Sequence, residues 1–118
     1  MGLADYVAMD IKNSPQKYGV TVGVENFDIS PINSSIELIK NSGVDYEFRT
    51  TVTENFHTVD DVEEIAKWIQ GAKHYYLQNF VDSGHLIDSN CKGVRKEIMY
   101  EMLEKARKYI PEAELRGI

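Results

Sequence analysis

The alternation of β-type and helical segments is the feature that most constrains how this chain can fold. Four short runs are rich in apolar, β-branched or aromatic residues, and they cover residues 6–11, 46–52, 74–80 and 113–118. Between them, apolar residues recur at helical spacing within residues 30–41, 58–70 and 98–109. The sequence therefore predicts an α/β fold with the order β-α-β-α-β-α-β. Because each crossover contains a helix, we expect parallel strands joined by right-handed connections.

Capping signals mark where two of the predicted helices begin. Ser30 followed by Pro31 is expected to provide the N-cap and the first position of one helix. Thr58 is expected to cap the next helix, with Asp60 and Asp61 near the positive end of its dipole. Both signals support the helical interpretation of the segments that follow them.

Two architectures satisfy this order of elements within the single domain that is predicted for residues 1–118. One is an open, doubly wound sheet that carries helices on both faces. The other is part of a (β/α) TIM-like barrel, in which all helices lie on one side of the sheet. The side on which the helices pack therefore distinguishes the two.

Polar residues collect at the carboxyl ends of the predicted strands. They are Asp10, Lys12, Arg49, Thr51, Gln78, Asn79 and Arg116. Asp10 and Lys12 are two positions apart, so both side chains should lie on the same face of the first strand. The long polar loops predicted at residues 12–30 and 81–93 leave from this same edge. Because parallel α/β folds place ligands there, the pattern favours a binding site over a merely solvated strand edge.

Two charged residues, Glu47 and Arg49, lie within the second predicted strand and share one of its faces. Charges in such a position are costly when they are buried without a partner. They either form salt bridges with each other and with neighbours, or they face a polar cavity such as the interior of a barrel. The sequence leaves both interpretations open.

The composition argues against several classes of function. A net charge of -6 disfavours nucleic-acid binding, since phosphate contacts need a basic surface. No apolar run approaches the roughly 18 residues that a membrane span requires. The single Cys91 rules out an intrachain disulfide or a four-cysteine metal site, and it fits a reducing cytoplasm. The three histidines lack the spacing of metal ligands.

Four segments, taken together, resemble the C-terminal half of the radical S-adenosylmethionine activating enzymes. They are YVAMDIKN (residues 6–13), VDYEFRTTV (44–52), LQNF (77–80) and AELRG (113–117). The likeness is closest to activating proteins of anaerobic ribonucleoside-triphosphate reductase, which are related to the pyruvate formate-lyase activating enzyme. It implies a partial (β/α) barrel with its site inside, at the carboxyl ends of the strands. It also implies a glycyl radical enzyme as the protein partner.

The resemblance assigns cofactor-binding roles to residues of this chain and a catalytic role to none. The cofactor-binding residues are Asp10, Lys12, Arg49, Gln78, Asn79 and Phe80. The first two match a strand-end pair that helps to hold the methionine and ribose portions of S-adenosylmethionine, and Asp10 can also join a monovalent-cation site. Arg49 would lie near the cofactor, and the last three residues would border its adenine.

The chain departs from this family because it lacks the C-x-x-x-C-x-x-C loop that ligates a [4Fe–4S] cluster. The resemblance begins at about the fourth barrel strand, so we expect a fragment that does not bind the cluster. Such a fragment is expected to be inactive alone, because reductive cleavage of S-adenosylmethionine needs the cluster. The missing strands would leave the first strand unpaired and the inner face uncovered, which predicts self-association.

The alternative function is that of a non-catalytic α/β binding or interaction module. Convergence of Asp10, Lys12 and Arg49 in one cleft would favour the enzyme part. An open sheet with helices on both faces, and with those three residues apart, would favour the module.

Overall fold

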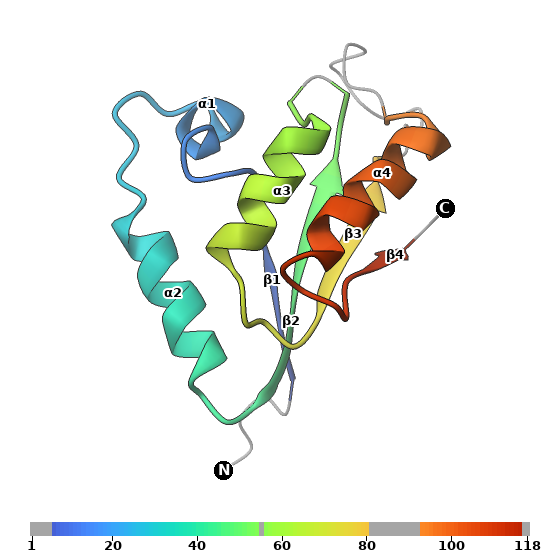
Figure 1. The fold of residues 1–118 in the computed structure, drawn as a ribbon. Helices are drawn as coiled ribbons and strands as arrows, with labels where there is room; N and C mark the ends of the chain where they lie inside the picture. The colour runs from blue at the N-terminus through green and yellow to red at the C-terminus, as the bar shows by residue number, and fades with distance from the viewer. Residues whose placement is uncertain (1–5, 55, 81–92, 117–118) are drawn as a thin grey trace.

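The computed structural model of the chain describes residues 6–54, 56–80 and 93–116. Within these ranges, strands alternate with helices as the sequence predicts (Figure 1). The elements are β1 (Tyr6–Asp10), α1 (Tyr18–Val22), α2 (Ser30–Lys40), β2 (Asp45–Val52), α3 (Val59–Trp68), β3 (Tyr75–Asn79), α4 (Lys96–Arg107) and β4 (Glu114–Arg116). The α/β fold is therefore confirmed.

The strands of the described chain form one parallel sheet in the order β1-β2-β3-β4. Each crossover leads to the next neighbouring strand, so crossovers of the same hand place their helices on the same face. Figure 1 shows α2, α3 and α4 packed on one side of the sheet. This is the arrangement of a barrel segment, whereas a doubly wound sheet reverses its strand order and is covered on both faces.

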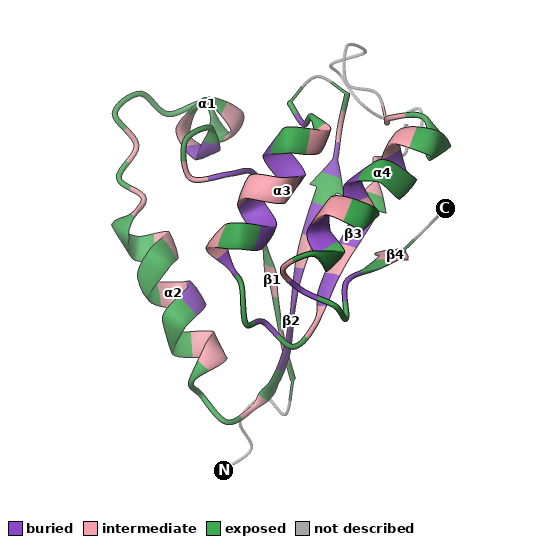
Figure 2. Ribbon diagram, viewed as in Figure 1, coloured by how far each residue is buried: buried purple, intermediate pink, exposed green. Residues whose placement is uncertain are grey.

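The hydrophobic core lies between the helices and one face of the sheet (Figure 2). In β2, alternate residues point toward the helices, and Phe48 and Val52 are completely buried there. Large buried side chains of this layer are Ile36, Phe48, Val62, Ile65, Leu77, Met99 and Met102. The buried faces thus follow the period of two in the strands and the period of about 3.6 residues in the helices.

The opposite face of the sheet is polar. The residues of β1 to β4 that alternate with the core-facing ones lie on it, and they include Tyr6, Asp10, Glu47, Arg49, Thr51, Tyr76, Gln78 and Arg116. The described residues therefore form a polar inner face, and this face gives no hydrophobic reason for self-association. Within them β1 pairs with β2 alone, so its outer edge remains the reason to expect self-association, which stays a prediction.

The start of α3 was predicted correctly, and the start of α2 was wrong by one residue. The Thr58 side chain accepts the Asp61 N–H at 3.1 Å, and the Asp61 carboxylate accepts the Thr58 N–H at 2.9 Å, which makes a capping box. In α2 the N-cap is Ile29, and Ser30 is the first helical residue. The reason is Asp28, whose carboxylate accepts the Ser30 N–H at 3.0 Å and so takes the capping role.

Helix α1 lies in the segment that the sequence indicates as a loop. Its five residues make little more than one turn, which is too short for an apolar stripe to repeat and mark a helix in the sequence. Tertiary contacts hold it instead, because the Tyr18 ring stacks on Phe27 at 5.4 Å and meets Trp68 edge-on at 6.1 Å between ring centroids. Gly19 permits this packing, since a Cβ there would lie 2.8 Å from the Phe27 Cβ.

The predicted loop at residues 81–93 lies outside the described residues except for Gly93, and so do His85 and Cys91. The last predicted strand is present as the short β4. None of the helices in the described chain is long and apolar enough to cross a membrane.

Candidate functional site

Three of the predicted site residues converge at the carboxyl end of β1. Asp10 is the register partner of Arg49 on β2, and the Arg49 Nε–H donates to the Asp10 carboxylate at 2.9 Å. The Lys12 ammonium lies 3.8 Å from the other Asp10 oxygen. Their side chains are 36–54% exposed, and such open ion pairs contribute little to stability. One acid and two cations therefore lie together at this strand end, and all three side chains are open to solvent.

The backbone of this strand end is held by side chains as well as by the sheet. The Ile11 N–H donates to the Arg49 carbonyl at 2.7 Å, which continues the β1–β2 ladder by one residue. The Ile11 carbonyl then accepts the Thr50 hydroxyl at 2.8 Å, and that hydroxyl accepts the buried Tyr75 hydroxyl at 2.6 Å. Because each buried donor finds an acceptor, this chain of hydrogen bonds fixes the strand beneath Asp10 and Lys12.

A small cavity of about 160 Å³ opens beside these residues. Its lining consists of Asp10, Ile11, Lys12, Thr21, Thr51, Thr53, Phe56 and His57. Sites for drug-sized ligands usually measure roughly 300–1,000 Å³, so this cavity is large enough for only part of a nucleoside-sized molecule. Arg49 lies next to the cavity through its contact with Asp10 and does not line it.

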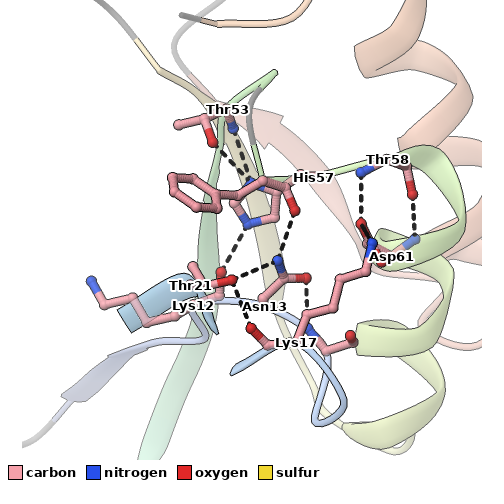
Figure 3. Close-up of polar contacts among 10 residues, drawn as sticks. Lys12, Asn13, Lys17, Thr21, Thr53, His57, Thr58 and Asp61 are labelled. Atoms are coloured by element: carbon pink, nitrogen blue, oxygen red, sulfur yellow. Dashed lines mark hydrogen bonds and ion pairs between the residues drawn. The ribbon is translucent and has the colours of Figure 1, made fainter. Parts of the chain in front are cut away.

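A buried hydrogen-bond network joins the two loops that form the wall of the cavity (Figure 3). Asn13 is fully buried, and its amide nitrogen donates to the Thr21 hydroxyl at 2.9 Å and to the Phe56 carbonyl at 2.8 Å. Its amide oxygen accepts the Ser14 N–H at 2.7 Å. The loop after β1 is thus tied both to α1 and to the loop after β2.

His57 makes a second link between the same two loops (Figure 3). Its Nδ1 lies 3.0 Å from the Thr53 N–H, and its Nε2 lies 2.8 Å from the Lys12 carbonyl. A backbone N–H can only donate and a carbonyl can only accept, so the ring is neutral with its proton on Nε2. Burial lowers the pKa of His57 below its usual value, and the hydrogen bond to the Lys12 carbonyl opposes that shift only partly.

The lowered pKa of His57 predicts a loss of stability in mild acid. The folded protein holds the ring neutral, so this contribution is complete above the unfolded-state pKa of 6.5 and is lost as the pH falls through the lower folded-state pKa. Urea unfolding of the wild type is expected to show this loss, and His57→Gln should remove it. Measurements kept above about pH 5 avoid the titration of carboxyl groups. Equal pH dependence of the two proteins would contradict the prediction.

Lys17 and Asp61 extend the network to the start of α3 (Figure 3). The Lys17 ammonium lies 3.0 Å from the same carboxylate oxygen that receives the Thr58 N–H. Burial alone would raise the pKa of Asp61, and the hydrogen bonds from Lys17 and Thr58 outweigh it, so that pKa lies below its usual value. The charge of Asp61 is therefore structural, because it serves the helix cap and the loop at once.

A second polar cluster occupies the middle of the open sheet face. The buried Glu47 carboxylate accepts the Tyr6 hydroxyl at 2.7 Å and the Arg116 guanidinium at 3.0 and 3.3 Å. The Arg116 guanidinium also lies 3.8 Å from the centre of the Tyr76 ring. The hydrogen bond to Glu47 raises the pKa of Tyr6 to about 12, so the hydroxyl stays protonated. Glu47 thus pairs with neighbours, which answers the question that its sequence position left open.

The structure does not bring Gln78, Asn79 or Phe80 into the cavity beside Asp10. Gln78 is exposed on the open face, next to Thr51 and Arg116 in the sheet register. The Asn79 side chain is engaged by backbone, since it donates to the Val94 carbonyl at 2.8 Å and accepts the Val94 N–H at 2.9 Å. Phe80 is half-buried, and its N–H continues the β2–β3 ladder.

The donor set of the described residues does not fit an iron–sulfur cluster. Clusters of this kind are held by cysteine thiolates, and residues 6–54, 56–80 and 93–116 include no cysteine. No group of three or more His, Cys, Asp or Glu side chains within those ranges is arranged to hold a metal ion. The assignment of Asp10 to a monovalent-cation site stays a prediction.

Sequence reasoning missed the buried residues that organise the cavity, Asn13 and His57 above all. Their partners, Phe56 and Lys12, are 43 and 45 positions away along the chain. Only the strand-end position of residue 13 and the polar character of the loop after β2 could have drawn attention to them. The sequence gives no direct signal of such long-range pairing.

Known proteins similar to this chain agree with the predicted class. No protein-family model matches the chain. It is 30% identical, over 122 aligned positions, to a protein of Methanocaldococcus jannaschii that is provisionally described as a glycyl-radical enzyme activating enzyme. That alignment takes in 98% of this chain and 50% of the relative, so the chain spans about half of the relative's length.

A solved structure shares the fold. It is a domain of the pyruvate-formate lyase-activating enzyme from Bacteroides vulgatus ATCC 8482, and it superposes with a TM-score of 0.71. The match covers 97% of this chain and 68% of the solved chain at 13% sequence identity. The structural likeness shows a common α/β architecture, and the sequence similarity links the chain to a glycyl-radical enzyme activating enzyme.

Proposed function

We propose that the chain is the C-terminal, S-adenosylmethionine-binding half of a radical S-adenosylmethionine activating enzyme. The observation that carries the proposal is the convergence of Asp10, Lys12 and Arg49 at the carboxyl edge of a barrel-type sheet. The sequence similarity to a glycyl-radical enzyme activating enzyme supports it. The alternative, a non-catalytic module, predicts helices on both faces of the sheet, whereas α2, α3 and α4 lie on one side of it.

The ion cluster suits the polar end of S-adenosylmethionine. In this proposal the cations of Lys12 and Arg49 attract the methionine carboxylate, and the Asp10 carboxylate accepts hydrogen bonds from the ribose or the amine. The Arg49 Nε–H already donates to the Asp10 carboxylate, and that hydrogen bond orients the guanidinium. The cavity of about 160 Å³ then takes the part of the ligand nearest to Lys12.

The adenine end would lie across the open face of the sheet. Gln78 pairs in register with Thr51 of β2, so it is two strands from β1. Two strand spacings are roughly 10 Å, which a nucleoside attached to methionine can span. Gln78 therefore remains proposed as part of the adenine border. Asn79 and Phe80 remain proposed there from the family resemblance, with the Asn79 amide, which points to the helix side of the sheet, acting through the Val94 backbone that it holds.

The proposal divides the whole activity between this chain and a cluster-binding part. The described residues cannot hold a [4Fe–4S] cluster, so this chain alone is proposed to bind S-adenosylmethionine without cleaving it. The partner in the full reaction would be a glycyl radical enzyme in the cytoplasm, and we propose one of the anaerobic ribonucleoside-triphosphate reductase type. The similarity to an activating enzyme supports the coarser part of this assignment.

Titration of the ¹⁵N-labelled chain with S-adenosylmethionine tests the proposal. We expect weak binding at millimolar ligand, seen as shifts of the Asp10, Lys12 and Arg49 amide resonances, because only half of the site is present. Methionine should reproduce the shifts near Lys12, since its carboxylate would meet the same cations. The exposed outer face of α4 should not respond.

A matched pair of variants makes the titration specific. Lys12→Met removes a cation of the site and should abolish the shifts, whereas Lys108→Met removes an exposed lysine after α4 and should leave them unchanged. Shifts that are absent in the wild type, or that survive Lys12→Met, would overturn the proposed binding site.

A further inference from the structure

The loops after β1 and β2 form the wall of the cavity, and His57 and Asn13 are the side chains that bridge them. Asn13 bonds to the Phe56 carbonyl and to the Thr21 hydroxyl of α1, so it holds the loops together without a hydrogen bond to Asp10, Lys12 or Arg49. His57 instead bonds to the main chain of Lys12 itself. The two side chains therefore have different roles, because Asn13 joins the loops and His57 holds the backbone of Lys12.

We propose that His57 is a positioning residue, which in its Nε2-protonated tautomer sets the direction of Lys12 into the ligand cavity. The proposal rests on the proposed function, because Lys12 is the residue that would meet the ligand. His57 itself lines the cavity wall, and both of its ring nitrogens are engaged by backbone groups, so it needs no contact with the ligand to act.

The ladder geometry explains why Lys12 needs this support. The last backbone bond from β1 to β2 is made by the Ile11 N–H, and beyond it the chain leaves the sheet. The Lys12 carbonyl would be without a partner in the sheet, and the His57 Nε2–H supplies one at 2.8 Å. Fixing that carbonyl fixes the peptide plane after Lys12, and with it the direction in which the side chain leaves the backbone.

The tautomer of His57 is set from the other side of the ring. The Thr53 N–H points at Nδ1 at 3.0 Å, so the proton must reside on Nε2. Thr53 is held in turn, because its carbonyl accepts the His57 N–H at 3.0 Å. The His57 ring is therefore fixed by the loop after β2, and through its Nε2–H it fixes the backbone of Lys12.

Two substitutions separate the two bonds of the ring. His57→Gln places an amide N–H near the position of Nε2 and keeps donation to Lys12. His57→Asn places an amide oxygen near the position of Nδ1 and keeps only the bond from Thr53. A positioning role predicts that His57→Asn lowers the affinity for S-adenosylmethionine about fivefold, the worth of one hydrogen bond, and that His57→Gln stays within about twofold.

The measurement is a titration with S-adenosylmethionine followed by ¹⁵N resonances, with thermal unfolding recorded for each variant. His74→Gln, which changes the histidine directly before β3, serves as the control and should match the wild type in affinity. A purely structural His57 would lower stability in both variants and leave their affinities equal, and that result would overturn the inference.

A readout without ligand keeps this test separate from that of the proposed function. The imidazole ¹⁵N resonances of the wild type at neutral pH should report a proton on Nε2. The Lys12 carbonyl and Asn13 amide resonances should move in His57→Asn and stay near their wild-type positions in His57→Gln. If the wild type bound no S-adenosylmethionine, the proposed function would fail, and these resonances alone would decide for or against the role of His57.

Discussion

Replacing Leu77 with alanine is expected to lower the free energy of unfolding by about 2–5 kcal/mol. Leu77 is completely buried in the middle of β3, on the face of the sheet that the helices cover, with β2 and β4 as its neighbouring strands. The substitution removes apolar contacts and leaves a cavity that a close-packed core fills only in part. Because small domains have a total stability of about 5–15 kcal/mol, this one change should be visible in any unfolding experiment.

Leu38→Ala is the matched control for this prediction. Leu38 lies on the outer side of α2 and is 72% exposed, so its truncation should change stability by no more than about 0.5 kcal/mol. Urea unfolding followed by circular dichroism compares the two variants. A similar effect at both positions would show that the core is not where the structure places it.

Replacing Asn13 with alanine is expected to cost about 2–4 kcal/mol, because a buried polar group without a partner costs about 1–3 kcal/mol. The change leaves the buried Ser14 N–H without its acceptor and the Phe56 carbonyl without its donor. Among the described residues, His57 would then be the side chain that still bonds to both the loop after β1 and the loop after β2. Chemical denaturation measures the loss, and faster hydrogen exchange of the Ser14 amide should accompany it.

Asn33→Ala provides the comparison at an exposed site. Asn33 lies on α2 and accepts the Trp68 indole N–H, and alanine is the better helix former at such a position. The two effects oppose each other, so stability should change little. An Asn13→Ala variant as stable as Asn33→Ala would refute the importance that we give to the buried network.

The fold could be predicted because its signals are local. Alternating burial in residues 46–52 and the helical stripe in residues 58–70 follow from the geometry of a single element, and both were located correctly. Helix α1 was not predicted, because it is stabilised by the contacts of Tyr18 with Phe27 and Trp68 and not by a local signal. The start of α2 was missed because Asp28 competes with Ser30 as the capping residue.

The site could be predicted only in part, for a related reason. Asp10, Lys12 and Arg49 were found because parallel strands bring their carboxyl ends to one edge, which is a rule of topology. The roles of Asn13 and His57 depend on hydrogen bonds between loops, and a single sequence carries no record of such pairs. The hydrogen bonds between the Asn79 side chain and the Val94 backbone could not be predicted for the same reason.

The sequential strand order has a consequence for how such a chain could be assembled. Every strand of the described sheet pairs with the strand before or after it in the chain, so no strand is inserted between two others that are consecutive in sequence. A further β-α unit could add to the free edge of β1 without breaking an existing bond or threading a loop. A cut between two β-α units of this sheet would therefore separate only one pair of neighbouring strands.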